Sequence, residues 1–270
     1  MSEPLFSVVT ISFNQVEFLA RAIESVITQG ARVQYIVCDP GSTDGSRAII
    51  DSYGAAIAER VFEQDEGPAD GLNRGFDRAR GDIYAYLNSD DTFLPGAFAS
   101  VARQFAAYPE VDVLTGHTLV TDREDKVLRR AWSDAYQRRL VAYGVTAHFQ
   151  TSTFIRASAF RRTAGFNPSN SSSWDSELLL DLFLSGANIA VIDAFLSTYR
   201  LHPTSITNSG SGRTDAQCFE KKRFERLMGR GQRPSDASLG LVYRVWKRLL
   251  APRATLERLR RGPIFMRGVE

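Results

Sequence analysis

Short apolar runs alternate with segments of helical spacing along the first ninety residues of this chain. Four runs rich in apolar and β-branched residues predict strands, at residues 6–13, 33–39, 60–64 and 82–88. Between them, apolar residues recur at the spacing of an amphipathic helix after Asn14, around Ile49 and after Pro68. Asn14 and Glu17 have the spacing of a capping box at the start of the first helix. The pattern therefore predicts the element order βαβαβαβ.

Residues 111–200 show a more mixed pattern. Strands are predicted at residues 111–115, 151–155, 189–192 and 196–200, and a hairpin turns at residues 123–125. Helices are predicted after Pro95, at residues 134–143 and at residues 175–184. Residues 209–212 are typical of a loop. We expect an α/β domain whose parallel half continues into a mixed half.

Length and composition favour a globular enzyme-sized chain. The 270 residues are 43% hydrophobic, which excludes a disordered or fibrous protein. Cys38 and Cys218 lie far apart without metal-type spacing, so neither a disulfide framework nor a zinc site is indicated. No apolar run approaches the roughly 18 to 20 residues that span a bilayer, and the first residues lack a signal-peptide pattern. We expect a cytoplasmic protein.

Charge divides the chain unevenly. Residues 221–270 hold 14 Lys and Arg against 4 Asp and Glu, although the whole chain has a net charge of only +2. We therefore predict a domain at residues 1–220. Residues 221–270 are predicted to form a basic, amphipathic helical tail.

Polar residues follow the predicted parallel strands. Ligands of such sheets bind outside the carboxyl ends of the strands, where Asn14, Asp39 and the NSDD segment at 88–91 are expected. The adjacent carboxylates of Asp90 and Asp91 concentrate negative charge, which must be solvated by water or neutralised by a hard cation. Mg²⁺ needs only one or two carboxylates when phosphate oxygens supply other ligands. A solvated turn is the structural alternative.

Several motifs together resemble the family 2 glycosyltransferases. They are TISFN at 10–14, CDPGSTDGS at 38–46, GDI at 81–83 and NSDD at 88–91. EQDEG at 63–67 and DGLNRG at 70–75 are similar to a subgroup in bacterial polysaccharide assembly. The resemblance spans about residues 5–207. It implies a GT-A fold, with a Rossmann-like, mostly parallel sheet flanked by helices. In such a fold, residues 1–116 would form the nucleotide-sugar-binding half and residues 117–220 the mixed acceptor-binding half.

The same resemblance implies a donor site and a metal. The donor would be a UDP-, GDP- or dTDP-sugar, and the cofactor Mg²⁺ or Mn²⁺. Asp91 would ligate the metal, with His202 of the YRLHPTSIT segment as a second candidate ligand. Pro40 replaces a second Asp of the usual family pattern. The donor-binding residues implied are Ser12, Asn14, Asp39, Asp70, Asn73, Asp90 and Arg200.

Inverting transfer also needs a base that accepts the proton of the attacking hydroxyl. The segment WDSEL at 174–178 resembles the family's catalytic segment and implies Asp175 as that base, with Glu177 in reserve. As an alternative, Asp175 caps the helix that it opens. Trp174 stands where the family usually has Glu, and its indole would stack on an acceptor sugar.

The basic, amphipathic pattern of the tail predicts a binding partner separate from the donor and the acceptor. A basic amphipathic helix binds nucleic acid or a membrane surface, and the chain lacks nucleic-acid-binding motifs. We therefore expect Trp246 and its neighbours to contact an anionic membrane at its inner face, where a carbohydrate or lipid-linked acceptor would lie. A helix packed on the domain is the alternative.

Two other functions remain compatible with these residues. One is a sugar nucleotidyltransferase, although the chain lacks that class's glycine-rich basic loop. The other is an inactive nucleotide-sugar-binding scaffold recruited to a membrane. The predicted activity is inverting glycosyl transfer in bacterial cell-surface polysaccharide or glycolipid synthesis.

Overall fold

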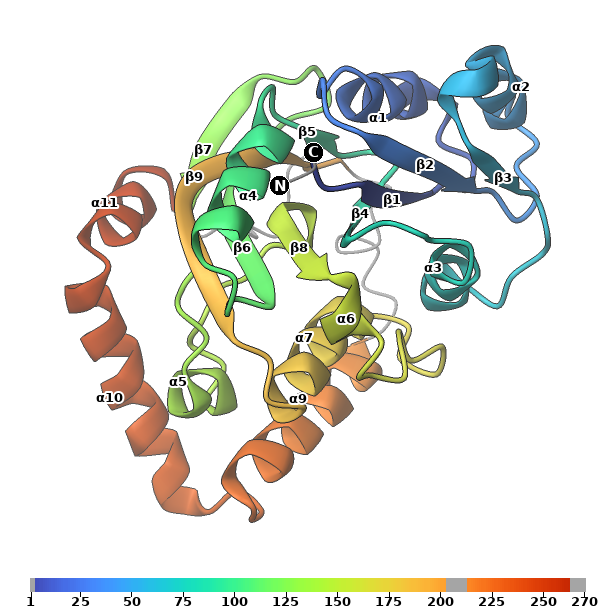
Figure 1. Ribbon diagram of the computed structural model, residues 1–270. Helices are drawn as coiled ribbons and strands as arrows, with labels where there is room; N and C mark the ends of the chain where they lie inside the picture. Colours follow the sequence, from blue (N-terminus) through green and yellow to red (C-terminus); the bar gives the residue numbers. More distant parts are fainter. Residues whose placement is uncertain (1–2, 203–212, 263–270) are drawn as a thin grey trace.

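The computed structural model describes residues 3–202 and 213–262, and its first half is a parallel βα fold (Figure 1). The sheet order β3-β2-β1-β4 is formed by β1 (Phe6–Ile11), β2 (Val33–Cys38), β3 (Glu59–Val61) and β4 (Ile83–Asn88). The connecting helices are α1 (Val16–Ile27), α2 (Ser46–Ser52) and α3 (Pro68–Phe76), with a 3-10 turn at Gly54–Ala56. The predicted βαβαβαβ order is confirmed.

The sheet continues beyond β4 into a mixed half. β8 (Thr153–Arg156) pairs antiparallel with both β4 and β6 (Val113–Thr121). β9 (Ile189–Arg200) runs parallel to β6, β7 (Val127–Ala131) forms the hairpin with β6, and the short β5 (Thr92–Phe93) pairs with β9. The two strands predicted at 189–192 and 196–200 are therefore one strand, whose register against β6 shifts between Thr115 and Thr118. The α/β prediction is confirmed.

Helices cover both faces of this sheet (Figure 1). On one face lie α1, α2 and α4 (Ala97–Ala107). On the other lie α3, α6 (Ala157–Phe160) and α7 (Trp174–Leu184). A 3-10 turn at Gln150–Ser152 and α5 (Arg138–Ala142) border the second half.

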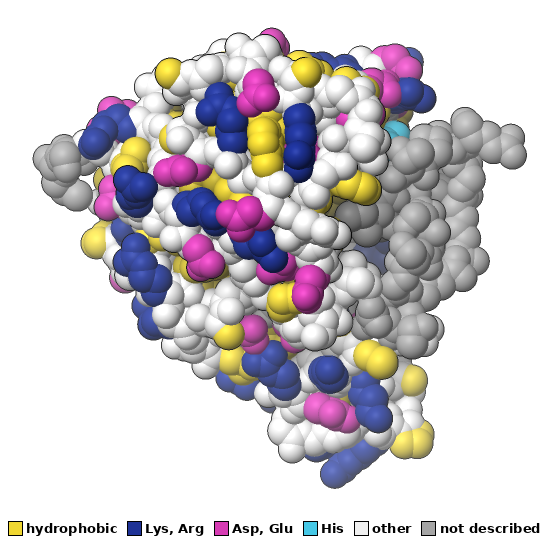
Figure 2. All heavy atoms as spheres, turned by 90° about the vertical axis from the view of Figure 1, so that its right-hand side faces the viewer, with side chains coloured by type: hydrophobic (Ala, Val, Ile, Leu, Met, Phe, Trp, Pro, Cys, Tyr) yellow, Lys and Arg dark blue, Asp and Glu magenta, His cyan; other side chains and the backbone are white. Residues whose placement is uncertain are grey.

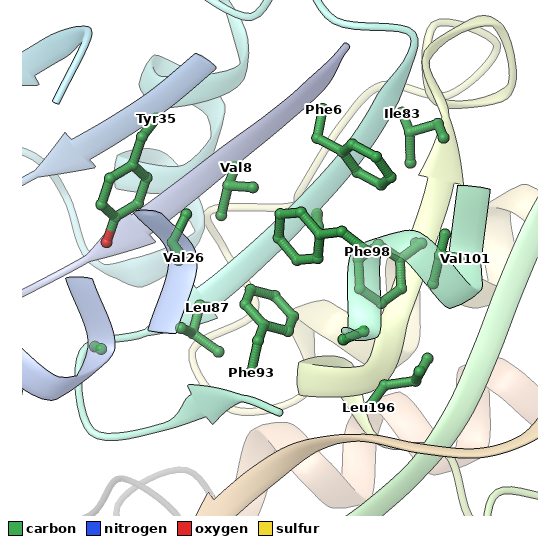
Figure 3. Close-up of a cluster of buried hydrophobic side chains, with 14 of the residues drawn as sticks. Phe6, Val8, Val26, Tyr35, Ile83, Leu87, Phe93, Phe98, Val101 and Leu196 are labelled. Carbon is green, nitrogen blue, oxygen red and sulfur yellow. The ribbon is translucent and has the colours of Figure 1, made fainter. Parts of the chain in front are cut away.

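A cluster of aromatic side chains packs α4 against the centre of the sheet (Figure 3). Phe98 stacks on Phe6 of β1 with ring centroids 4.7 Å apart, and it meets the edges of Phe93 and Phe154 at 5.0 and 5.7 Å. Burying one such side chain contributes about 1.5 to 3 kcal/mol. The strands whose ends carry the polar residues are therefore rigidly supported.

On the opposite face of the sheet, α3 packs very close to β1. A Cβ added to Gly75 would lie only 2.4 Å from Cγ1 of Val9 in β1, so only glycine lets the helix come this near. The first turn of α3 lies at the same edge of the sheet as the carboxyl ends of β1 and β2.

The predicted capping box at α1 is wrong. Gln15 occupies the N-cap position, and the backbone N–H of Val16 donates to the carboxylate of Asp44 at 2.9 Å. Asn14 instead adopts a φ of 52° and its side-chain oxygen accepts from the backbone N–H of Thr43 at 2.9 Å. The loop that follows β1 and the loop that follows β2 are therefore hydrogen-bonded to each other at the end of the sheet.

Three helices lie within the described residues 213–262. They are α9 (Arg213–Met228), α10 (Pro234–Leu250) and α11 (Pro252–Arg261). Phe224 and Leu227 of α9 are buried with side chains of α5 and α7, so the predicted boundary at residue 220 falls inside a packed helix. Among the described helices, none is both long and apolar enough to traverse a bilayer.

Charges are mixed on the face that carries β3, α2 and α3. Figure 2 shows Lys and Arg side chains interspersed with Asp and Glu there. Arg74 and Arg78 both pair with Glu63, and Arg80 pairs with Glu59. Such exposed pairs contribute about 0 to 1 kcal/mol each, so this face is a solvated surface.

Candidate functional site

A cavity of about 560 Å³ opens beyond the carboxyl ends of β1, β2 and β4. The buried polar atoms nearby that have no hydrogen-bond partner within the described residues include Oγ of Ser12 and Oδ2 of Asp39. An unpaired buried polar atom costs about 1 to 3 kcal/mol, so both favour a polar ligand. The cavity is lined by Ile11, Ser12, Phe13, Gln15, Pro40, Gln64, Asp65, Gly67, Pro68, Asn88, Ser89, Asp90, Tyr199 and Arg200.

The other oxygen of Asp39 is firmly held. Oδ1 accepts from the backbone N–H groups of Gly41 and Ser42 at 3.1 and 2.8 Å, and from Nε of Arg47 at 3.1 Å. These bonds fix the carboxylate in one orientation and leave Oδ2 as its available acceptor. Asp39 itself does not line the cavity, although its neighbour Pro40 does, so its contact with the donor stays a prediction.

Asp90 and His202 meet at the edge of this cavity. Nε2 of His202 lies 2.9 Å from Oδ2 of Asp90, and the exposed fractions of the two side chains are 2% and 16%. A carboxylate and an imidazole together are donors suited to Mn²⁺ or Mg²⁺. No cluster of three or more such ligands occurs in the described part of the chain, so a cation here would need oxygens from its substrate.

Asp91 occupies a different environment from Asp90. Its side chain is 1% exposed, and Oδ1 accepts from the backbone N–H of Arg200 at 2.9 Å. Burial and, secondarily, the charge of Asp90 raise the pKa of Asp91 well above its ordinary value. Of the two carboxylates it is Asp90, rather than the predicted ligand Asp91, that lines the cavity.

Arg200 lines the cavity and is held in place by several protein groups. Its Nε donates to the carbonyl of Asp90 at 2.7 Å, and Nη1 donates to the carbonyls of Asp122 and Arg123 at 3.1 and 3.0 Å. Nη2 pairs with Asp125 at 2.5 Å, and the side chain is fully buried. These contacts tie the β6–β7 hairpin to the Asp90 turn, and Arg200 also lines the cavity, so its role in donor binding stays a prediction.

Asp70 and Asn73 of α3 also engage protein groups. Asp70 accepts from Nε of Arg74 at 2.9 Å and from the N–H of Glu66 at 3.1 Å. Both amide atoms of Asn73 bond the backbone of Phe166, at 2.8 and 2.9 Å. Neither residue lines the first cavity. Asn73 instead fixes a loop of the second half to the first.

A second cavity, of about 510 Å³, adjoins the first, because Asn88 and Tyr199 line both. Asp175, at the start of α7, lies in its wall, and burial raises the pKa of this carboxyl above its ordinary value. A raised pKa is typical of a carboxylate that takes up a proton in a reaction. The predicted role of Asp175 as the catalytic base stays a prediction.

Trp174 and Glu177 lie mainly in the protein interior. The Trp174 indole is 6% exposed and packs on Phe166 and Tyr86, with ring centroids 5.6 and 5.9 Å away. Glu177 accepts from Nδ2 of Asn167 and of Asn170, at 3.2 and 2.6 Å. Trp174 lines the second cavity, whereas Glu177 does not.

Sequence analysis missed several residues of the second cavity. Both ring nitrogens of His148 and both amide atoms of Gln150 are buried without a partner among the described residues. Burial lowers the pKa of His148 to about 4, so the ring is neutral at pH 7. The only sequence signal was a polar pair before β8. The predicted loop at 209–212 lies outside the described residues.

Comparison with known proteins adds sequence relatives. The family profile described as Glycosyl transferase family 2 matches residues 7–163. An uncharacterized glycosyltransferase of Nostoc sp. is 30% identical over 129 residues, which cover 46% of this chain and 40% of the relative. A putative teichuronic acid biosynthesis glycosyltransferase, TuaG, of Bacillus subtilis is 36% identical over 33% of this chain and 37% of its own length. The matches span less than half of these relatives.

Solved structures share the fold across nearly the whole chain. TarS 1-349 of S. aureus in complex with UDP-GlcNAc aligns with a TM-score of 0.65 and 14% identity, covering 94% of this chain and 74% of that one. The mannosyltransferase PcManGT from Pyrobaculum calidifontis, in complex with GDP-Man and Mn²⁺, aligns with a TM-score of 0.62 and 16% identity, covering 96% and 74%. These likenesses confirm the predicted GT-A fold.

Proposed function

Because this chain belongs to glycosyltransferase family 2, we propose that it transfers a sugar from a nucleotide diphosphate sugar to an acceptor hydroxyl, with inversion at the anomeric carbon. One observation carries the proposal. Two cavities meet at Asn88 and Tyr199, one bordered by Asp90 and the other by Asp175. A donor and an acceptor bound side by side would bring their reacting atoms together at that junction.

The larger cavity suits the nucleotide sugar. Ser12 and Asp39 offer unpaired oxygens for the base or ribose, and the rigid Asp39 turn fixes their direction. TarS and PcManGT, whose structures contain UDP-GlcNAc and GDP-Man, support a nucleotide sugar as donor. The fold alone is shared at such low identity, so the base and the sugar stay open between UDP-, GDP- and dTDP-sugars.

A divalent cation fits beside the donor. Asp90 would hold Mn²⁺ or Mg²⁺, and His202 would either join it as a ligand or orient the carboxylate by the contact it already makes. When bound, the cation stabilises negative charge on the diphosphate. Asp91 supports the site from within, because its carboxylate fixes the backbone of Arg200, whose side chain holds the carbonyl of Asp90.

Asp175 is the proposed base. Its carboxylate accepts the proton of an acceptor hydroxyl in the second cavity while that oxygen bonds to C1 of the donor sugar. The bond between C1 and the diphosphate breaks with its electron pair going to the diphosphate. One displacement of this kind inverts the anomeric carbon and needs no covalent intermediate.

The C-terminal helices supply a membrane-facing surface in this proposal. α10 contacts the domain through Gly240, Tyr243 and Lys247, and these contacts leave its apolar side chains outside. Apolar side chains exposed by 44% to 79% along α10 and α11 are Leu239, Leu241, Val242, Val245, Trp246, Leu249, Leu250, Leu256 and Leu259. Arg244 and Arg248 are exposed among them. Apolar side chains with basic neighbours are suited to an anionic lipid surface.

Co-sedimentation with vesicles tests this surface. The chain should bind phosphatidylglycerol vesicles and not phosphatidylcholine vesicles, and Arg244→Gln with Arg248→Gln should weaken binding, by about 1 kcal/mol per charge. Leu249→Gln with Leu259→Gln should abolish it. Equal binding to both lipids, or none, would contradict this part of the proposal.

Transfer itself is tested by incubating the chain with nucleotide sugars, Mn²⁺ and a panel of saccharide and lipid-linked acceptors. Wild type should form a product whose new linkage has the anomeric configuration opposite to that of the donor. Asp175→Asn should bind the nucleotide without turnover. Binding without turnover in wild type across the panel would favour an inactive scaffold, as would no activity combined with vesicle binding.

A further inference from the structure

The second cavity is lined by an arginine that forms no ion pair within the described residues. Arg223 of α9 lines the cavity together with Asp175, and its buried Nε has no hydrogen-bond partner in the described part of the chain. No carboxylate of the described residues lies within ion-pair distance of it. Burial lowers the pKa of Arg223, and the charge of Glu220, an exposed residue that lines the same cavity without pairing with Arg223, opposes this shift.

Neighbouring arginines show that this is unusual for the region. Arg226 on the same helix pairs with Asp181 at 2.7 Å, and Arg230 just beyond it pairs with Asp236 at 2.7 Å. A desolvated guanidinium without a partner is unfavourable, whereas one paired by two N–H groups with a carboxylate or phosphate is strongly held. The arrangement at Arg223 therefore suits an incoming anion.

The local backbone makes room for this guanidinium. Gly144, with a φ of 63°, closes the turn after α5, and a Cβ there would lie 2.8 Å from Nη2 of Arg223. On its other side the guanidinium carbon lies 5.7 Å from the centroid of the Phe219 ring. Glycine and an aromatic face thus hold the side chain without occupying its hydrogen-bond donors.

We propose that Arg223 forms a subsite for an anionic group, a carboxylate or a phosphate, on the acceptor sugar. The proposal deepens the proposed function and rests on it. The acceptor hydroxyl lies at Asp175, and the unpaired atoms of His148 and Gln150 bind further hydroxyls of the same sugar. The anionic substituent reaches Arg223 on the α9 side of the cavity. The enzyme thereby selects acidic over neutral acceptors.

Binding of matched sugars tests this subsite directly. The probes are methyl β-glucoside, methyl β-glucuronide and glucose 6-phosphate, titrated by calorimetry into the full chain with Mg²⁺ and saturating UDP, so that the donor cavity is filled. Either anionic sugar should bind at least about tenfold more tightly than the neutral one, as a charged hydrogen-bond pair allows. Comparison of the two anionic sugars decides between carboxylate and phosphate.

Two variants complete the test. Arg223→Gln should reduce the preference to about one while UDP affinity stays unchanged, which shows that the fold is intact. Lys222→Gln removes the same charge from an exposed position of the same helix and should keep the preference. Equal binding of neutral and anionic sugars, absence of any sugar binding, or an equal loss in both variants would overturn the subsite. Loss of UDP binding in wild type would instead overturn the proposed function.

Discussion

Replacing Arg200 distinguishes a structural role from a phosphate-binding role. Arg200→Met keeps much of the side-chain volume but removes the donors to the carbonyls of Asp90, Asp122 and Arg123 and the partner of Asp125. Breaking a buried pair costs about 3 to 5 kcal/mol, and each orphaned buried acceptor about 1 to 3 kcal/mol without simple additivity. Because Asp125 is 40% exposed, we take about 3 to 5 kcal/mol for the whole change.

This loss should be visible as a fall in Tm. One kcal/mol corresponds to about 2 to 4 °C for a chain of this size, so the expected decrease is roughly 6 to 20 °C by calorimetry. UDP affinity measured at 10 °C, where the variant stays folded, should fall only modestly, through the displaced Asp90 turn. Arg123→Gln is the matched control, since it removes an exposed pair with Glu17 at the same hairpin and should change Tm little. An unchanged Tm with UDP binding lost in Arg200→Met would refute the structural role.

Further changes test other parts of the account. Asp175→Asn should lower transfer by about 10²- to 10⁴-fold with UDP affinity unchanged, and activity in that variant equal to wild type would exclude Asp175 as base. Since burial raises the folded pKa of Asp175, its stabilising contribution is present below the unfolded pKa and is lost as pH rises. Asp175→Asn should therefore raise Tm at pH 7.5, a gain that shrinks toward pH 4, and the acid limb of kcat/KM in wild type should lie above the ordinary Asp value of 3.8. Asn73→Ala should cost about 1 to 3 kcal/mol in denaturant unfolding, because both Phe166 bonds are lost; an unchanged midpoint would contradict this. Gly75→Ala should cost about 1 to 3 kcal/mol through the clash with Val9, and a stability equal to wild type would show that α3 can move away.

The local sequence pattern was sufficient to predict the parallel half of the fold. Each of its strands and helices is specified by a short run of residues, and the polar residues at the strand ends follow from that order. The single strand β9 was predicted as two because Asp193 and Ala194 interrupt its apolar pattern, although pairing with β6 continues on both sides. Tertiary pairing, which a short window of sequence does not contain, decided that case.

Roles within the site were harder to predict than its location. Asp90 and Asp91 have the same chemistry and are adjacent, so only the turn after β4 decides which carboxylate lines the cavity and which is buried at the backbone of Arg200. The contacts of Arg200 with residues 122–125 join segments about 75 residues apart, which no motif encodes. Arg223 lines the second cavity because α9 packs against α5 and α7, and the local sequence does not encode that packing.

Release of nucleoside diphosphate is the most direct test of the central claim. Wild type, Asp90→Asn and Asp175→Asn would be assayed with UDP-, GDP- and dTDP-sugars, Mn²⁺ and the acceptor panel. The account predicts acceptor-dependent release from one class of donor, abolished by EDTA and in both variants, with nucleotide binding weakened only in Asp90→Asn. Release that is unaffected by EDTA and by both substitutions would contradict it.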